Sequence, residues 1–173
     1  WSSCLSLLNK KVVGTDINMT RLLVARDIAF SMNIQNLDFI FMRAEKTNFE
    51  KESFDAIFCY GVFMFTNMPA ALREFSRILK PGGKILAVEA LDYNPLIKIY
   101  RMMTPDMRTE WEKAHILSLK DVDFASRFFK INSIKYWHIT AYIGAKLTTL
   151  KPLLCKIDPF LERIPFLQRM AWI

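Results

Sequence analysis

The sequence predicts an α/β domain built on a doubly wound, mostly parallel sheet. Between residues 11 and 90, short apolar segments of strand length alternate with amphipathic segments of helical length. This alternation favours right-handed β-α-β crossovers and a parallel sheet. The 173 residues, 52% of them hydrophobic, are enough for one buried core. No repeat, linker or low-complexity segment divides the chain, so we expect a single domain over residues 1–173.

Four segments have the pattern of buried parallel strands: residues 11–16, 37–42, 54–60 and 84–90. Each is short and apolar and is bounded by polar or turn-forming residues. Strands covered by helices on both faces have this continuous apolar character. The order of these segments along the chain therefore sets the expected sheet.

The helices between these strands have recognisable starts and stops. Asn18 is expected to cap a helix over residues 19–30, because its side chain can accept a hydrogen bond from the first turn. Pro69 is placed to begin a second helix. Residues 80–83, Lys-Pro-Gly-Gly, should end that helix, since proline blocks its continuation and glycine accepts a positive φ.

The pattern changes after the fourth strand. Residues 93–129 are predicted to form a helical cap on the substrate side, with helix starts at Asn94-Pro95 and Thr104-Pro105 and a capping box that begins at Ser118. Residues 131–139 alternate well enough to predict a further strand.

Charge and cysteine content restrict the function classes. Lysine and arginine number 24 against 17 acids, a net charge of +7, but they are dispersed, so no nucleic-acid partner is expected. Three widely spaced cysteines without a C-x-x-C pair indicate neither a metal site nor a disulfide framework, and they suit the cytoplasm. No uncharged apolar run is long enough for a membrane-spanning helix. The apolar, basic C-terminal region could still touch a membrane surface.

Functional residues are expected where strands end, because open parallel sheets bind ligands at the carboxyl edge. Asp16 follows the first strand, and its carboxylate can accept hydrogen bonds from both hydroxyls of a ribose. Ala44-Glu45 follows the second strand and could border an adenine ring. Tyr60-Gly61 follows the third strand and could form one wall of the ligand site. Each also has a structural explanation: helix capping for Asp16, an ordinary loop acid for Glu45, and strand-end packing for Tyr60-Gly61.

Three stretches resemble successive parts of one enzyme family: VVGTDINMTRLLVAR, FIFMRAEKTNFEKESFDAIFCYGVF and EFSRILKPGGKILAVEAL. Taken in this order, they look like class I S-adenosylmethionine-dependent methyltransferases, especially the small-molecule and quinone-type group. The resemblance runs from Val12 to Leu91 and implies a Rossmann-like sheet with S-adenosylmethionine as the cofactor. It implies that six residues at the strand ends bind this cofactor: Asp16, Ile17, Ala44, Glu45, Tyr60 and Gly61.

The sequence departs from the family pattern in two places. The family has a first strand and a G-x-G-x-G loop ahead of the segment that begins here, so we expect a domain that lacks this strand and loop and is a fragment of the active unit, with an incomplete C-terminal end as well. Arg43 stands where family members tend to have an acid, which bears on the adenine contact assigned to Ala44 and Glu45.

The resemblance implies methyl transfer to a small or apolar acceptor, for which no universal catalytic residue is required. A base is needed only if the acceptor holds its proton near neutral pH, and His115 is the candidate, although a packed structural histidine is the alternative. Two other functions stay open. One is a non-catalytic methyltransferase-like binding module. The other is a nicotinamide-dependent oxidoreductase, because an acid after a strand also holds the ribose of NAD.

Overall fold

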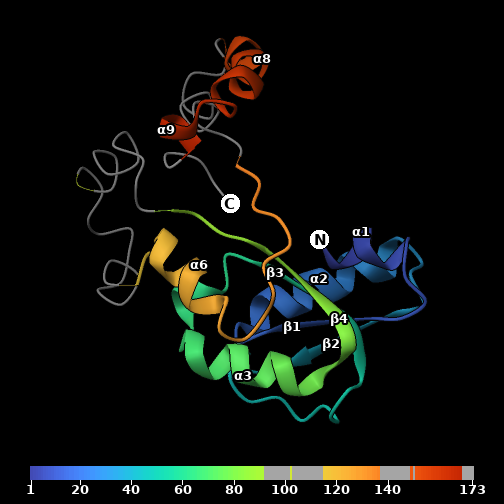
Figure 1. Ribbon diagram of the computed structural model, residues 1–173. Helices are drawn as coiled ribbons and strands as arrows, with labels where there is room; N and C mark the ends of the chain where they lie inside the picture. The colour runs from blue at the N-terminus through green and yellow to red at the C-terminus, as the bar shows by residue number, and fades with distance from the viewer. Residues whose placement is uncertain (92–101, 103–114, 137–148, 150, 169–173) are drawn as a thin grey trace.

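The structure is a computed structural model of the chain, and it describes residues 1–91, 102, 115–136, 149 and 151–168 (Figure 1). The described elements follow in this order: α1 (Ser2–Ser6), β1 (Val12–Asp16), α2 (Met19–Ser31), β2 (Leu37–Phe41), β3 (Phe54–Tyr60), η1 (Phe63–Phe65), α3 (Met68–Ile78), β4 (Leu79–Val88), α6 (Leu119–Ala125), α8 (Lys151–Leu161) and α9 (Pro165–Gln168).

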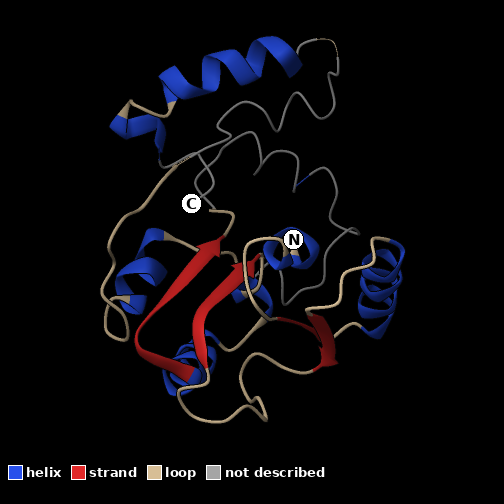
Figure 2. Cartoon of the chain, turned by 90° about the vertical axis from the view of Figure 1, so that its right-hand side faces the viewer, coloured by secondary structure: helices blue, strands red, loops and turns tan. Residues whose placement is uncertain are grey.

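The strands form two parallel pairs, with helices on either side of them (Figure 2). β1 pairs with β2 in unbroken register, from Val12 opposite Leu37 to Asp16 opposite Phe41. β3 pairs in parallel with β4. The order of the elements and the parallel pairing confirm the predicted α/β class, and all four predicted strands are present.

The described strands form two separate pairs, whereas one doubly wound sheet was expected from the sequence. β1 pairs only with β2, and β3 only with β4. The ring of Trp1 stands against β3, with its centroid 5.5 Å from that of Phe58 and 5.4 Å from that of Tyr60.

α2 begins and packs as the sequence predicts. The side chain of Asn18 accepts a hydrogen bond from the amide of Arg21 at 3.1 Å, which caps the first turn. Leu22 and Ala29 are buried on the face that contacts β1 and β2. The helix therefore covers one face of this strand pair.

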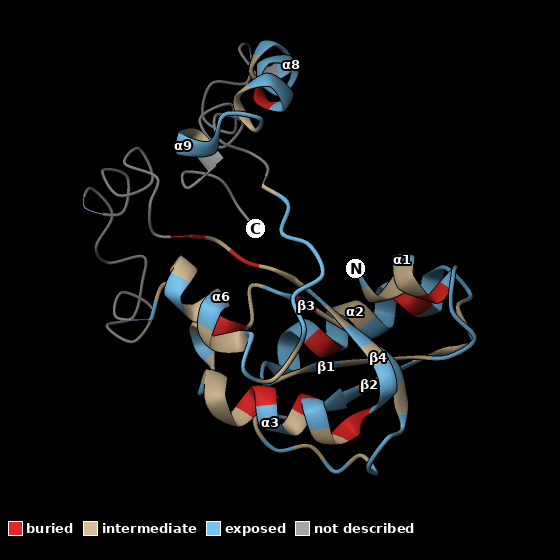
Figure 3. Ribbon diagram, viewed as in Figure 1, coloured by how far each residue is buried: buried red, intermediate tan, exposed pale blue. Residues whose placement is uncertain are grey.

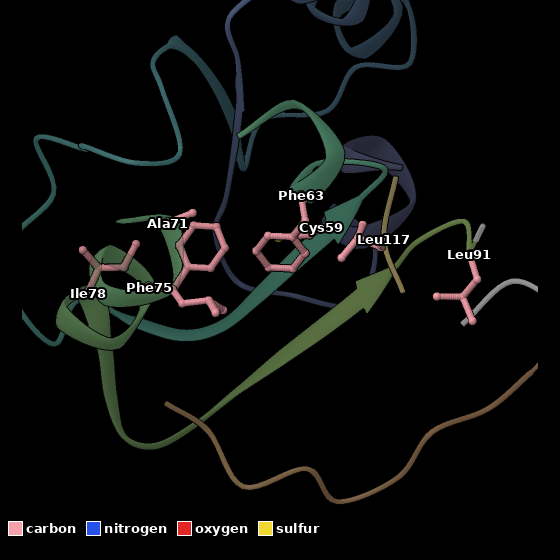
Figure 4. Packing of buried hydrophobic residues seen from close by; sticks show 8 residues of the cluster. Cys59, Phe63, Ala71, Phe75, Ile78, Leu91 and Leu117 are labelled. Carbon is pink, nitrogen blue, oxygen red and sulfur yellow. The ribbon is translucent and has the colours of Figure 1, made fainter. Parts of the chain in front are cut away.

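α3 carries the centre of the main core (Figures 3 and 4). Asn67 caps it by accepting from the amide of Ala70 at 3.1 Å, with Pro69 in the first turn as expected. The buried residues around α3 come from β3, η1, α3 and the chain after β4. They form one cluster: Cys59, Phe63, Ala71, Leu72, Phe75, Ile78, Leu91 and Leu117. This cluster joins β3, η1 and α3 to the chain on both sides of residues 92–114.

The passage from α3 to β4 differs in detail from the predicted turn. β4 begins at Leu79, five residues earlier than expected, but the ladder jumps from Phe54 opposite Leu79 to Ala56 opposite Lys84. Residues 80–83 therefore bulge out of the pairing, and Gly82 adopts the positive φ of 79° that favours glycine. The sequence located the turn correctly, although the strand continues through it.

An ion-pair network ties the connection between β2 and β3 to α3. Glu74 accepts hydrogen bonds from Arg77 at 2.6 and 2.9 Å, from the amide of Thr47 at 2.9 Å and from the Thr47 hydroxyl. Arg77 also donates to the carbonyl of Phe49 at 2.8 Å. The hydrogen bond from Arg77 is the main reason that the pKa of Glu74 falls to about 2.

The later part of the chain confirms one prediction and corrects another. At the start of α6, the Asp121 carboxylate accepts from the amide and hydroxyl of Ser118 at 2.7 and 2.8 Å, as the capping box requires. Residues 131–136 form no strand. Tyr136 packs against the core, whereas Ile131 and Ile134 are exposed, and no neighbouring strand pairs with this segment.

Two further expectations concern the cap over residues 93–129 and membrane-spanning helices. The helix starts predicted at residues 94–95 and 104–105, and with them most of the proposed cap over residues 93–129, lie outside the described residues. Among the helices that are described, none is long and apolar enough to cross a membrane.

Candidate functional site

Hydrogen bonds connect the loops that follow β1, β2 and β3. The amide of Met42, directly after β2, donates to the carbonyl of Asp16 at 3.1 Å. The amide of Asn67 donates to the Glu45 carboxylate at 3.2 Å, which links the loop after β2 to the start of α3. The structure therefore joins the end of β1 to that of β2, and the loop after β2 to the chain between β3 and α3.

Asp16 lies partly buried at the end of β1, beside the exposed side chain of Ile17. Its Oδ1 accepts from the amide of Asn18 at 2.8 Å, and Asn18 itself caps α2, so Asp16 supports the start of the helix without being its cap. A carboxylate has about four acceptor sites, and this bond uses one of them. This contact of Asp16 is therefore compatible with hydrogen bonds to a ligand.

Glu45 joins two loops and is less available than the sequence suggested. Its Oε1 accepts from Arg43 at 3.3 Å and from the amide of Asn67 at 3.2 Å. Burial raises the pKa of Glu45, but hydrogen bonds from the backbone and from Arg43 outweigh it, so the pKa lies below its ordinary value. Ala44 packs against the core. A contact of Ala44 and Glu45 with an adenine ring stays a prediction.

A hollow of about 290 Å³ lies beside this link. Its lining consists of a cation, an acid, an aromatic ring and an amide: Arg43, Glu45, Phe65 and Asn67. Such a lining has both the polar groups and the apolar face that a heterocyclic ring requires. Arg43, which replaces the acid typical of the family, supplies the positive charge here.

Gly61, the residue after β3, has a backbone conformation that favours glycine. Its φ is +60°, and its amide donates to the carbonyl of Val88 at 2.9 Å. A Cβ placed there would meet no atom within 4 Å. The space beside Gly61 is therefore open, and the half-exposed ring of Tyr60 stands next to it in the chain.

Glu89 is a buried acid at the end of β4 that the sequence analysis did not select. It is 3% exposed, and its Oε1 accepts from the amides of Val62 at 2.8 Å and Phe63 at 3.1 Å. Its Oε2 is buried without a hydrogen-bond partner among the described residues. Burial raises the pKa of Glu89, and burial together with the Glu89 charge raises the pKa of Cys59 to about 12. The signal in the sequence was an acid within the apolar run ILAVEAL.

A cavity of about 360 Å³ opens between the start of α3 and the chain that precedes α6. The residues that line it mix apolar and polar side chains: Phe63, Thr66, Asn67, Met68, Pro69, His115, Ile116, Leu117 and Asp121. His115, the candidate base, thus faces the loop that follows β3.

Comparison with known sequences decides between the families that such an edge could serve. A family described as a methyltransferase domain matches residues 2–87, about half of the chain. Over 81 residues the chain is 38% identical to the ubiquinone/menaquinone biosynthesis C-methyltransferase UbiE of Pseudoalteromonas translucida, which covers 46% of this chain and 32% of that protein. The chain belongs to the class I S-adenosylmethionine-dependent methyltransferases.

Solved structures show that this methyltransferase chain has the family fold. A putative methyltransferase from Bacillus halodurans superposes with a TM-score of 0.60 at 23% identity, covering 72% of this chain and 55% of that one. The YcgJ protein of Bacillus subtilis gives a TM-score of 0.57 at 24% identity, covering 68% of this chain and 51% of that one. The chain spans about a third of the length of the curated relatives it matches. Family membership favours the methyltransferase interpretation over the nicotinamide-dependent one.

Proposed function

We propose that the protein transfers a methyl group from S-adenosylmethionine to a small, apolar acceptor, and that this chain supplies part of the active unit. The observation that carries the proposal is the position of Asp16 and Gly61 at the carboxyl ends of β1 and β3 in a methyltransferase-family chain, with open space beside Gly61. The relative from Pseudoalteromonas translucida is named for C-methylation in quinone biosynthesis, which supports an acceptor with an apolar ring.

The residues present fit this cofactor in chemical type. Asp16 supplies a carboxylate for the ribose hydroxyls, and Ile17 supplies an exposed apolar side chain for the flat face of a base. Gly61 leaves room for close approach, since nothing occupies the position of its missing Cβ. The bound cofactor supplies an activated methyl group, and these residues orient it and exclude water.

The mixed cavity beside η1 suits an acceptor of the same class. Phe63 and Leu117 offer apolar walls, and Asn67 offers an amide that can fix a ring oxygen. We place the acceptor in this cavity. His115 lines it and can take a proton from an acceptor that needs a base, whereas an acceptor already deprotonated at neutral pH needs none.

The test is a methyl-transfer assay with a tritiated methyl donor. The 173-residue sequence contains no G-x-G-x-G loop, so the assay compares the chain alone with a fusion in which the family's first strand and glycine loop precede Trp1. We expect the fusion to transfer label into organic-extractable phenols or quinols. A fusion that binds cofactor and transfers no label to any ring acceptor would instead support a non-catalytic binding module.

Two further assignments belong to this proposal. We infer a cytoplasmic location, because Cys4, Cys59 and Cys155 are all unpaired. We also propose peripheral membrane contact through α8, where Leu153, Ile157 and Phe160 share one exposed face beside basic side chains. Sedimentation with vesicles of phosphatidylcholine and phosphatidylglycerol tests the contact, and equal binding by Phe160→Ser would contradict it.

A further inference from the structure

Glu89 lies between Gly61, which we assign to the cofactor, and the cavity that Phe63 lines, which we assign to the acceptor. It follows β4 directly, and its Oε1 accepts the amides of Val62 and Phe63, which begin η1. The first amides of a helical turn lack partners within the turn, so they need an acceptor from elsewhere. Glu89 supplies that acceptor across 26 and 27 positions of sequence.

This contact fixes the direction in which the chain leaves β3. Gly61 holds a left-handed conformation immediately before the two bound amides. Phe63, whose amide Glu89 binds, places its side chain in the core and in the lining of the 360 Å³ cavity. A shift of the Val62–Phe63 turn would therefore move the cavity wall and the open space beside Gly61 together.

A residue selected only for stability would not be a buried carboxylate with one oxygen unpartnered. Within the part of the chain that the structure describes, Oε2 of Glu89 makes no hydrogen bond, and burial of an incompletely paired acid costs stability. A carboxylate does offer shorter, stronger hydrogen bonds to backbone amides than a neutral acceptor does. The arrangement favours firm placement of the turn over stability.

We propose that Glu89 is a positioning residue for acceptor specificity, which holds the Val62–Phe63 turn so that Phe63 forms one wall of the acceptor cavity. The inference rests on the proposed function for the identity of the cavity, and it adds the residue that sets the cavity's shape. Glu89 acts through Phe63, and it needs no contact with the acceptor.

The experiment measures binding of two phenols, 1-naphthol and phenol, to the 173-residue chain by amide-shift titration in NMR. The wild type should prefer the bicyclic ring. Glu89→Leu leaves both amides unpaired and should weaken 1-naphthol binding at least tenfold (about 1.4 kcal/mol), with loss of the preference over phenol. Glu89→Gln keeps an oxygen acceptor and should bind 1-naphthol within threefold of the wild type.

Two controls separate positioning from general destabilisation. Ile78→Ala removes buried volume from the far end of α3, away from the cavity lining, and should lower stability without altering probe affinity in the folded protein. Glu89→Asp withdraws the carboxylate by one methylene, and its affinity for 1-naphthol should also fall. This variant replaces Glu89→Leu in the test if Glu89→Leu does not fold.

The inference is overturned if Glu89→Leu binds 1-naphthol as tightly as the wild type does. If Glu89→Leu does not fold, unchanged affinity in Glu89→Asp overturns it. A wild type that binds neither phenol also overturns it. Failure of the methyl-transfer assay with an intact binding pattern would instead reject the proposed function and leave the positioning role standing. The two failures are therefore distinguishable.

Discussion

Glu74 offers a sharp test of the electrostatics that hold the β2–β3 connection on α3. In Glu74→Gln the side chain keeps an oxygen for the Thr47 amide but loses the charge that pairs with Arg77. The pKa of Glu74 lies at about 2, against an ordinary value of 4.5. At about 1.4 kcal/mol per unit this difference corresponds to about 3 kcal/mol. The Arg77 side chain is 38% exposed, so solvent screening lowers the expected loss to about 1–2 kcal/mol.

The pH dependence of this loss follows from the direction of the pKa. A carboxyl whose folded pKa is depressed stabilises the protein above its unfolded value, and the contribution disappears as the pH falls through the folded value. The difference in unfolding free energy between wild type and Glu74→Gln should thus be constant above about pH 5 and shrink from pH 4.5 towards 2. Urea denaturation at several pH values measures it.

The matched control is Asp55→Asn, which removes the ion pair between Asp55 and Lys80. That pair is also short, at 2.8 Å, but the Asp55 side chain is 85% exposed, so its removal should change the urea midpoint far less. A difference between wild type and Glu74→Gln that is equal at pH 6 and pH 3, or no larger than that of the control, would refute the reasoning.

Three other variants have definite expectations. Gly61→Ala should cost about 1–2 kcal/mol in urea denaturation, because alanine at φ +60° is strained although its methyl meets no atom; a neutral substitution would contradict the left-handed conformation. Asn67→Ala should cost about 1 kcal/mol of unfolding free energy by removing the cap on the Ala70 amide, and an unchanged midpoint would show that the cap is unimportant. Glu89→Gln should gain stability relative to wild type as the pH rises above about 4.5, because a carboxyl with a raised folded pKa loses stability through that window; parallel pH profiles would contradict the buried charge.

Local patterns predicted much of the fold because their causes are local. Asn18 caps α2 through a bond that spans three residues, and Pro69 lies in the first turn of α3. The four strands follow from short apolar runs, and the turn at residues 80–83 follows from its proline and glycines. The prediction of a strand over residues 131–139 was wrong for residues 131–136. An alternating pattern yields a strand only if another strand lies beside it to pair with.

The site was predicted less completely, since burial and pairing depend on distant residues. The position of Asp16 after β1 could be inferred from sheet topology alone. The involvement of Glu45 with Asn67 and the burial of Glu89 against Phe63 join residues 22 and 26 positions apart. No periodic pattern reports such contacts, so neither the link from Glu45 to Asn67 nor the role of Glu89 was predicted.

The central claim is that the carboxyl edge around Asp16 binds the methyl-donor cofactor, and calorimetry with S-adenosylhomocysteine tests it most directly. In the fusion that carries the family's glycine loop ahead of Trp1, we expect measurable binding that Asp16→Ala weakens by about 1–3 kcal/mol, the range for a lost charge-assisted hydrogen-bonding group. The chain without that loop should bind weakly or not at all. Equal affinity in the fusion and its Asp16→Ala variant, or tight binding of NAD by the fusion, would contradict the account.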